Sequence, residues 1–168
     1  MQNKIRMIVD LYLTLCYGVR KPTFKITANG SDIIYKEKSK NKTGNLEEII
    51  VSFEYLTDPD LPQCISVIHY GKTDQDLIID NGKLVVDHYI KIEELEIDKI
   101  QFGINLLNAT TFYHSMDANW IEDMKKQKIE ILPSYCPGTS LNLNGRTDIK
   151  FTLPIWQWWC EKLQSYLI

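Results

Sequence analysis

Four aspartates with the chemistry of a calcium site gather around one predicted turn. They are Asp74, Asp76, Asp80 and Asp87. Carboxylates and turn carbonyls are the hard oxygen ligands that Ca²⁺ prefers, and a loop can spread to fit the ion. The spacing is not that of an EF-hand, because the glycine and the closing glutamate of that loop are missing. Aspartate is also common in turns, where it accepts hydrogen bonds from backbone amides. The segment therefore predicts either a calcium site or a solvated polar turn.

Histidines supply a second candidate site in the same region. His69 and His88 fall on neighbouring predicted strands, so we expect their rings to face each other across a hairpin. A zinc site would need a third ligand, which Asp74 or Asp87 could provide. The alternative is a pair of structural histidines whose ring nitrogens are hydrogen-bonded inside the fold.

Aromatic residues suggest two binding surfaces. Tyr113, Trp120 and Tyr135 lie in an irregular segment, residues 103–140, where flat rings could stack on a sugar or could cover an open end of the core. Near the C-terminus, Trp156, Trp158 and Trp159 follow one another on a predicted helix. Successive helical residues point about 100° apart, so these three rings cannot all face one core. At least one is expected at a protein–protein interface or beneath a loop.

Motifs for catalysis are missing from the sequence. It contains no Gly-X-Ser-X-Gly, His-Glu-X-X-His, Gly-X-Gly-X-X-Gly or Walker pattern. The four cysteines lack metal-ligand spacing, and we expect them to be reduced. The sequence thus predicts a protein that is not an enzyme.

Charge and hydropathy limit the partners. The chain has 19 basic and 22 acidic residues, a net charge of −3, which gives no general field to attract nucleic acid. Residues 5–19 are apolar, but Arg6 and Asp10 interrupt them and no cleavage site follows. The stretch is also too short for a membrane span. We expect neither an export signal nor a membrane-spanning segment.

Alternation and tight turns predict the elements that position these residues. Apolar residues alternate along 5–16, 46–55 and 83–102, with a slip near Asp98 that a bulge would produce. Asn-Gly pairs at 29–30, 81–82 and 144–145 predict three hairpins. The polar run 36–45 is expected to be a loop, and Pro154 to begin a helix.

These elements predict an all-β protein. The architecture is an antiparallel two-sheet β-sandwich, jelly-roll-like, with one C-terminal α-helix. No repeat or linker is visible, so residues 1–168 are expected to form a single domain.

Several segments resemble small β-sandwich structural proteins of tailed bacteriophages, which look like carbohydrate-binding modules. The resemblance covers roughly residues 45–168 and rests on these segments: Ile65–Asp74, Asp80–Lys83, Val86–Ile92 and Phe151–Trp159. It implies a non-enzymatic virion protein, made in the host cytoplasm, that serves as a head, neck, tail or fibre component. Its partners would be other virion proteins or further copies of itself, with glycan binding as an additional capacity.

Two other classes remain open. One is a stand-alone carbohydrate-binding module from a bacterial glycan-degrading system, assisted by calcium, because the loop of Asp74, Asp76 and Asp80 is similar to the calcium loops of xylan-binding jelly-roll modules. The other is a glycan-acting hydrolase with a groove across one sheet, since two of the 22 acidic residues could converge in space.

Overall fold

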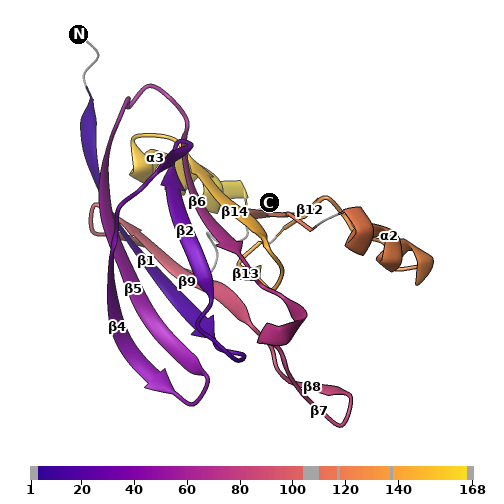
Figure 1. Cartoon of the computed structure of the whole chain (residues 1–168). Coiled ribbons are helices and arrows are strands. Elements are labelled where there is room, and N and C mark those ends of the chain that lie inside the picture. The colour runs from indigo at the N-terminus through magenta and orange to yellow at the C-terminus, as the bar shows by residue number, and fades with distance from the viewer. Residues whose placement is uncertain (1–3, 104–109, 117, 137, 166–168) are drawn as a thin grey trace.

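Two antiparallel sheets stacked face to face form the body of the protein in the computed structural model (Figure 1). The structure describes residues 4–103, 110–116, 118–136 and 138–165. Its strands are β1 Ile5–Cys16, β2 Thr23–Ala28, β3 Ser31–Asp32, β4 Lys36–Thr43, β5 Leu46–Thr57, β6 Gln63–Tyr70, β7 Ile78–Asp80, β8 Lys83–Val86, β9 Tyr89–Ile97, β10 Ile100–Phe102, β11 Thr110–His114, β12 Ser134–Tyr135, β13 Ser140–Leu141 and β14 Gly145–Phe151. Its helices are the 3₁₀ turn η1 Asp74–Asp76 and the α-helices α2 Ala118–Lys126 and α3 Ile155–Ser165.

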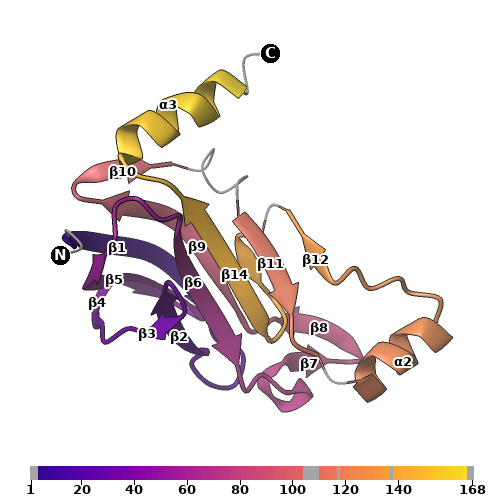
Figure 2. The same ribbon diagram turned by 90° about the horizontal axis from the view of Figure 1, so that it is seen from above.

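The strand order confirms the predicted two-sheet sandwich. The first sheet runs β10-β9-β1-β5-β4, with β13 beside β9, and the second runs β12-β11-β14-β6-β2-β3. Strands β7 and β8 pair only with each other. This β7–β8 ribbon projects away from the two sheets, as does α2 (Figures 1 and 2).

The core lies between the two sheets and follows the alternation read from the sequence. On β1, Met7, Val9, Leu11, Leu13 and Leu15 are all buried, whereas the residues between them are exposed or half-buried. Because side chains alternate across a strand, this pattern places one face of the first sheet on the core. The second sheet contributes its own buried aliphatic residues to the same cluster.

Two of the three predicted Asn-Gly hairpins are present. Asn29 and Gly30 have φ values of 50° and 82°, and Asn81 and Gly82 have 49° and 74°, the left-handed values that such turns require. The third prediction is wrong. Strand β13 pairs with β9 of the first sheet, whereas β14 pairs with β6 and β11 of the second, so residues 142–144 connect two sheets.

Three other local predictions need correction. The expected bulge near Asp98 is a two-residue turn, in which Asp98 and Lys99 have φ values of 49° and 68° and β9 folds back onto β10. The expected loop at 36–45 is strand β4, which pairs with β5 along the edge of the first sheet. Helix α3 confirms the C-terminal helix, but it is not the only α-helix, because α2 forms within the irregular segment.

Candidate functional site

The structure separates the four aspartates. Asp76 is 3% exposed, and its carboxylate accepts hydrogen bonds from Arg20 Nε at 2.5 Å and from the Thr73 amide at 2.7 Å. Asp87 pairs with Lys72 at 2.7 Å, while Asp74 and Asp80 are exposed. Within the described ranges, no group of three or more His, Cys, Asp or Glu side chains could hold a metal ion. Asp76 and Asp87 are each held by an ion pair, whereas Asp74 and Asp80 face solvent, so the described structure does not bring the four carboxylates together.

Asp76 connects this loop to the segment between β1 and β2. The Arg20 guanidinium and the hydrogen bonds from Thr73 hold the pKa of this carboxyl far below its usual range, although burial opposes them. The Asp76 carbonyl also accepts a hydrogen bond from the Val19 amide at 2.9 Å. Gly18 permits this close approach, because a Cβ atom there would lie 1.5 Å from the same carbonyl oxygen. The contacts therefore hold the β1–β2 connection against η1.

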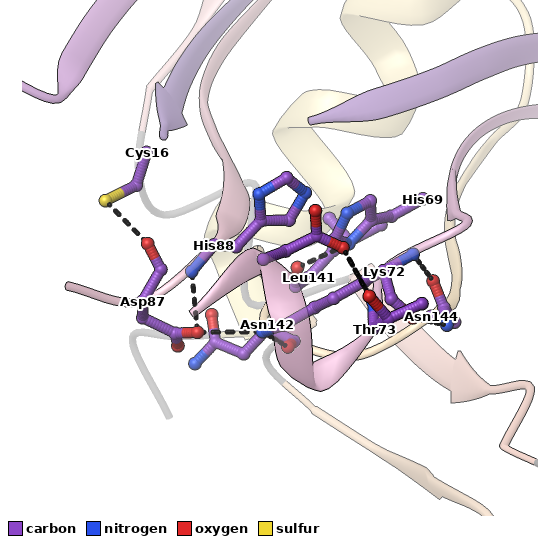
Figure 3. A network of polar contacts seen from close by, with 10 residues as sticks. Cys16, His69, Lys72, Thr73, Asp87, His88, Leu141, Asn142 and Asn144 are labelled. Carbon is purple, nitrogen blue, oxygen red and sulfur yellow. Dashed lines mark hydrogen bonds and ion pairs between the residues drawn. The ribbon is translucent and has the colours of Figure 1, made fainter. Parts of the chain in front are cut away.

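His69 and His88 do face each other (Figure 3), but not across a hairpin as the sequence predicts, because His69 lies on β6 of the second sheet and His88 lies between β8 and β9. Their rings stack with centroids 5.4 Å apart and an interplanar angle of 25°, and both residues are essentially inaccessible to solvent. His69 Nδ1 lies 3.0 Å from the Leu141 carbonyl, so this nitrogen carries the hydrogen and donates it. In the described part of the chain, His69 Nε2 and His88 Nδ1 are buried without a hydrogen-bond partner.

The surroundings of the two histidines keep them neutral. Burial, together with a smaller effect of the neighbouring His88, lowers the pKa of His69 to about 4. Burial also lowers the pKa of His88, an effect that the negative charge of Asp76 opposes. Stacked rings do not aim their in-plane lone pairs at a common point, which agrees with the lack of a third ligand in the described structure. The pair belongs to the packed interior.

Lys72 joins this network to the crossing between β13 and β14 (Figure 3). Its ammonium donates to Asp87 and to the Asn142 carbonyl. Its backbone amide donates to Asn144 Oδ1 at 2.8 Å, and Asn144 Nδ2 donates back to the Lys72 carbonyl at 2.9 Å. Charged hydrogen bonds of this kind fix geometry. These hydrogen bonds hold Lys72, Asp87 and residues 142–144, which are distant in the sequence, next to one another beside the histidines.

Cys16 also contacts this network. Its thiol lies 3.3 Å from the Asp87 carbonyl, to which it donates. Burial raises the pKa of the Cys16 thiol, which is opposite to the lowered pKa of reactive cysteines. The geometry and the electrostatics of the network therefore fit a role in stabilising the fold.

The predicted glycan-binding aromatics are not brought together as one platform. Tyr135 is paired with Phe112 and Tyr113 with Ser134, so the two tyrosines lie on opposite faces of the β11–β12 pair. The guanidinium of Arg146 lies 5.1 Å from the centre of the Tyr113 ring. Trp120 is half-buried on α2, outside both sheets.

The three C-terminal tryptophans are divided between the core and the surface. Trp158 is buried, with its ring 6.2 Å from each of Phe102 and Phe151. Trp159 is half-buried against Phe102, at 5.2 Å. Trp156 is 60% exposed. As the helical spacing predicts, one ring cannot share the core with the other two.

Trp156 stands at the edge of an apolar groove. The groove has a volume of about 370 Å³ and is lined by Ile5, Met7, Pro59, Asp60, Asp98, Leu153, Pro154, Ile155 and Trp156. Leu61, the residue after Asp60, is also more than half exposed. We call this surface the Trp156 groove. Sequence periodicity identifies the helix but does not reveal that the start of β1 and the β5–β6 turn complete the groove.

A further exposed apolar surface lies on the β7–β8 ribbon. Ile79, Leu84 and Val85 are each more than half exposed. The ribbon pairs with neither main sheet, so its apolar residues stay at the surface.

Comparison of the chain with protein-family models, with curated proteins and with solved structures gave no match. Among the helices that the structure describes, none combines the length and the apolar character needed to cross a membrane.

Proposed function

We propose that the protein is a non-enzymatic structural protein that acts through protein–protein assembly. The observation that carries this proposal is the exposed ring of Trp156 at the apolar groove beside Ile5 and Pro59. Large apolar side chains that gather at the surface mark interaction sites, and tryptophan is enriched among the residues that dominate binding energy.

The kind of assembly is inferred from the sequence pattern. The segments that resemble structural proteins of tailed bacteriophages include Phe151–Trp159, which supplies the exposed tryptophan. We therefore propose a virion component of the head, neck, tail or fibre, with a second copy of this chain as the first partner to test. We also propose that the sandwich has a jelly-roll topology. The chain crosses repeatedly between the two sheets, which supports that topology.

Native mass spectrometry and light scattering over a range of protein concentrations test the proposal. We expect the wild-type chain to self-associate, and Trp156→Ser to weaken association by on the order of 2 kcal/mol, about thirtyfold in the dissociation constant. Val19→Ser is a matched control, because Val19 is similarly exposed but lies outside the groove. A wild-type protein that stays monomeric at all concentrations, or a Trp156→Ser variant that assembles like the wild type, would contradict self-assembly through this groove.

A further inference from the structure

Strand β4 is a long, free sheet edge. All eight of its residues are exposed, and it pairs only with β5. The other terminal strands of the two main sheets, as far as the structure describes them, have two or three residues each. Figure 1 shows β4 at the outer border of the first sheet, with its far side uncovered. An edge strand presents unpaired backbone donors and acceptors to which a further strand can be added.

Lysines alternate along this edge. Lys36, Lys38, Lys40 and Lys42 make no ion pair within the described chain, whereas Glu37 is paired with Lys21. The Lys40 and Lys42 ammonium groups lie 5.8 Å and 4.8 Å from the rings of Tyr12 and Tyr17. Residues two apart on a strand are separated by about 6.7 Å. Lys40 occupies the bulge between Ser39 and Asn41, so Lys42 is paired with Glu47 and faces the opposite side of the sheet from Lys36 and Lys38. We call Lys36, Lys38 and Lys40 the lysine edge.

A second copy of this chain is the wrong occupant for the lysine edge. Pairing of β4 with β4 of another molecule would set lysines against lysines, and like charges on directly opposed strands are destabilising. This repulsion opposes self-association but leaves the strand open to an anionic partner.

A broad polyanion is also disfavoured, because the sheet face next to the lysine edge is acidic. Its carboxylates belong to these residues: Asp10, Glu48, Glu54, Glu93, Glu94 and Glu96. Glu48, Glu93 and Glu94 line a groove with Tyr12 and Lys40, so the positive charge is confined to a narrow strip. A nucleic-acid duplex would overlap these carboxylates, whereas a single extended chain would follow the strip.

We infer that β4 binds an extended acidic polypeptide segment by strand addition. Backbone hydrogen bonds would supply affinity, and alternating carboxylates on the added strand would have the same spacing as Lys36 and Lys38, which lie on the regular part of β4 before the bulge. The surface is separate from the Trp156 groove, so this inference does not depend on the assembly proposed above.

Fluorescence anisotropy with a labelled nine-residue peptide of alternating glutamate and threonine tests the inference. We expect saturable binding that weakens with salt and falls at least tenfold in the triple variant Lys36→Gln, Lys38→Gln, Lys40→Gln. Arginine at the same three positions should restore binding. The control variant Lys83→Gln, Lys125→Gln, Lys128→Gln removes the same charge elsewhere and should bind like the wild type. Lack of binding, or equal loss in both glutamine variants, would overturn the inference.

Two N-methylated versions of the peptide distinguish strand addition from simple charge attraction. Each is methylated on every second amide, one on the odd positions and one on the even positions. Only one edge of an added strand faces β4, so one version should lose binding and the other should keep it. Equal binding of both versions, or equal affinity for a single-stranded DNA of the same charge, would show attraction to charge alone and would overturn strand addition.

Discussion

His69 and His88 make the stability of the fold depend on pH between about 6.5 and 4. The two rings are stacked, buried and neutral, and the pKa of His69 is lowered to about 4 from an ordinary value of 6.5. Between these pH values the unfolded chain binds more protons at this site than the folded chain does. The free energy of unfolding therefore decreases as the pH falls through this interval, by about 3 kcal/mol for His69.

Denaturant unfolding at a series of pH values between 7 and 4 measures this effect. His69→Phe keeps a ring of similar size but removes the titrating group, so its stability should fall much less steeply with pH. The variant also loses the hydrogen bond to Leu141, which lowers its stability at every pH and leaves the slope as the readout. Tyr70→Phe is a neighbouring control that should keep the wild-type slope. A His69→Phe slope equal to the wild-type slope would contradict the assignment.

Some of these side-chain contacts can be predicted from the sequence and others cannot. The sequence predicts that His69 and His88 face each other across a hairpin; the rings do face each other, but from β6 and from the connection between β8 and β9, which are not paired strands. The sequence does not identify Arg20 as the partner of Asp76, because the two residues are 56 positions apart and no local pattern links them. The four aspartates were grouped by sequence proximity, but burial of Asp76 and pairing of Asp87 with Lys72 direct them to different contacts.

At the scale of elements, helix α3 carries one tryptophan that packs in the core, Trp158, and one that is exposed at the surface, Trp156. Trp158 packs edge-on against Phe102 and Phe151, so Trp158→Ala leaves a cavity and should lower the unfolding free energy by about 3–5 kcal/mol. Trp156→Ala removes an exposed ring and should change the stability of the isolated chain by less than about 0.5 kcal/mol. Urea denaturation of both variants at low protein concentration checks the difference. Similar losses in the two variants would contradict this division.

Strands with a buried face were predictable, whereas edge elements were not. The alternation of β1 gives its bounds directly, because one face must enter the core. Strand β4 has no buried face, so Lys36–Thr43 carries no apolar alternation and resembles a loop in the sequence. The turn at Asp98 and Lys99 has left-handed φ values without the glycine that usually marks them. Conversely, Asn144-Gly145 has the hairpin sequence but lies where the chain changes sheets.

At the scale of the whole molecule, α3 connects the two sheets. Phe102 belongs to β10 of the first sheet and Phe151 to β14 of the second, and the Trp158 ring contacts both. Figure 2 shows α3 beside β10, at the end of the sandwich where β14 finishes. The buried residues of both sheets also form one hydrophobic cluster. Neither sheet can expose its inner face without uncovering the other.

This shared core predicts that the chain unfolds as a single cooperative unit, as small domains commonly do. Far-ultraviolet circular dichroism reports the sheets, and near-ultraviolet circular dichroism reports the packed rings of Trp158 and Trp159. Both signals should change at the same denaturant concentration, because the helix and the two sheets lose their packing together. A near-ultraviolet transition that precedes the far-ultraviolet one would show that α3 detaches from an intact sandwich, and the single-unit prediction would then be wrong.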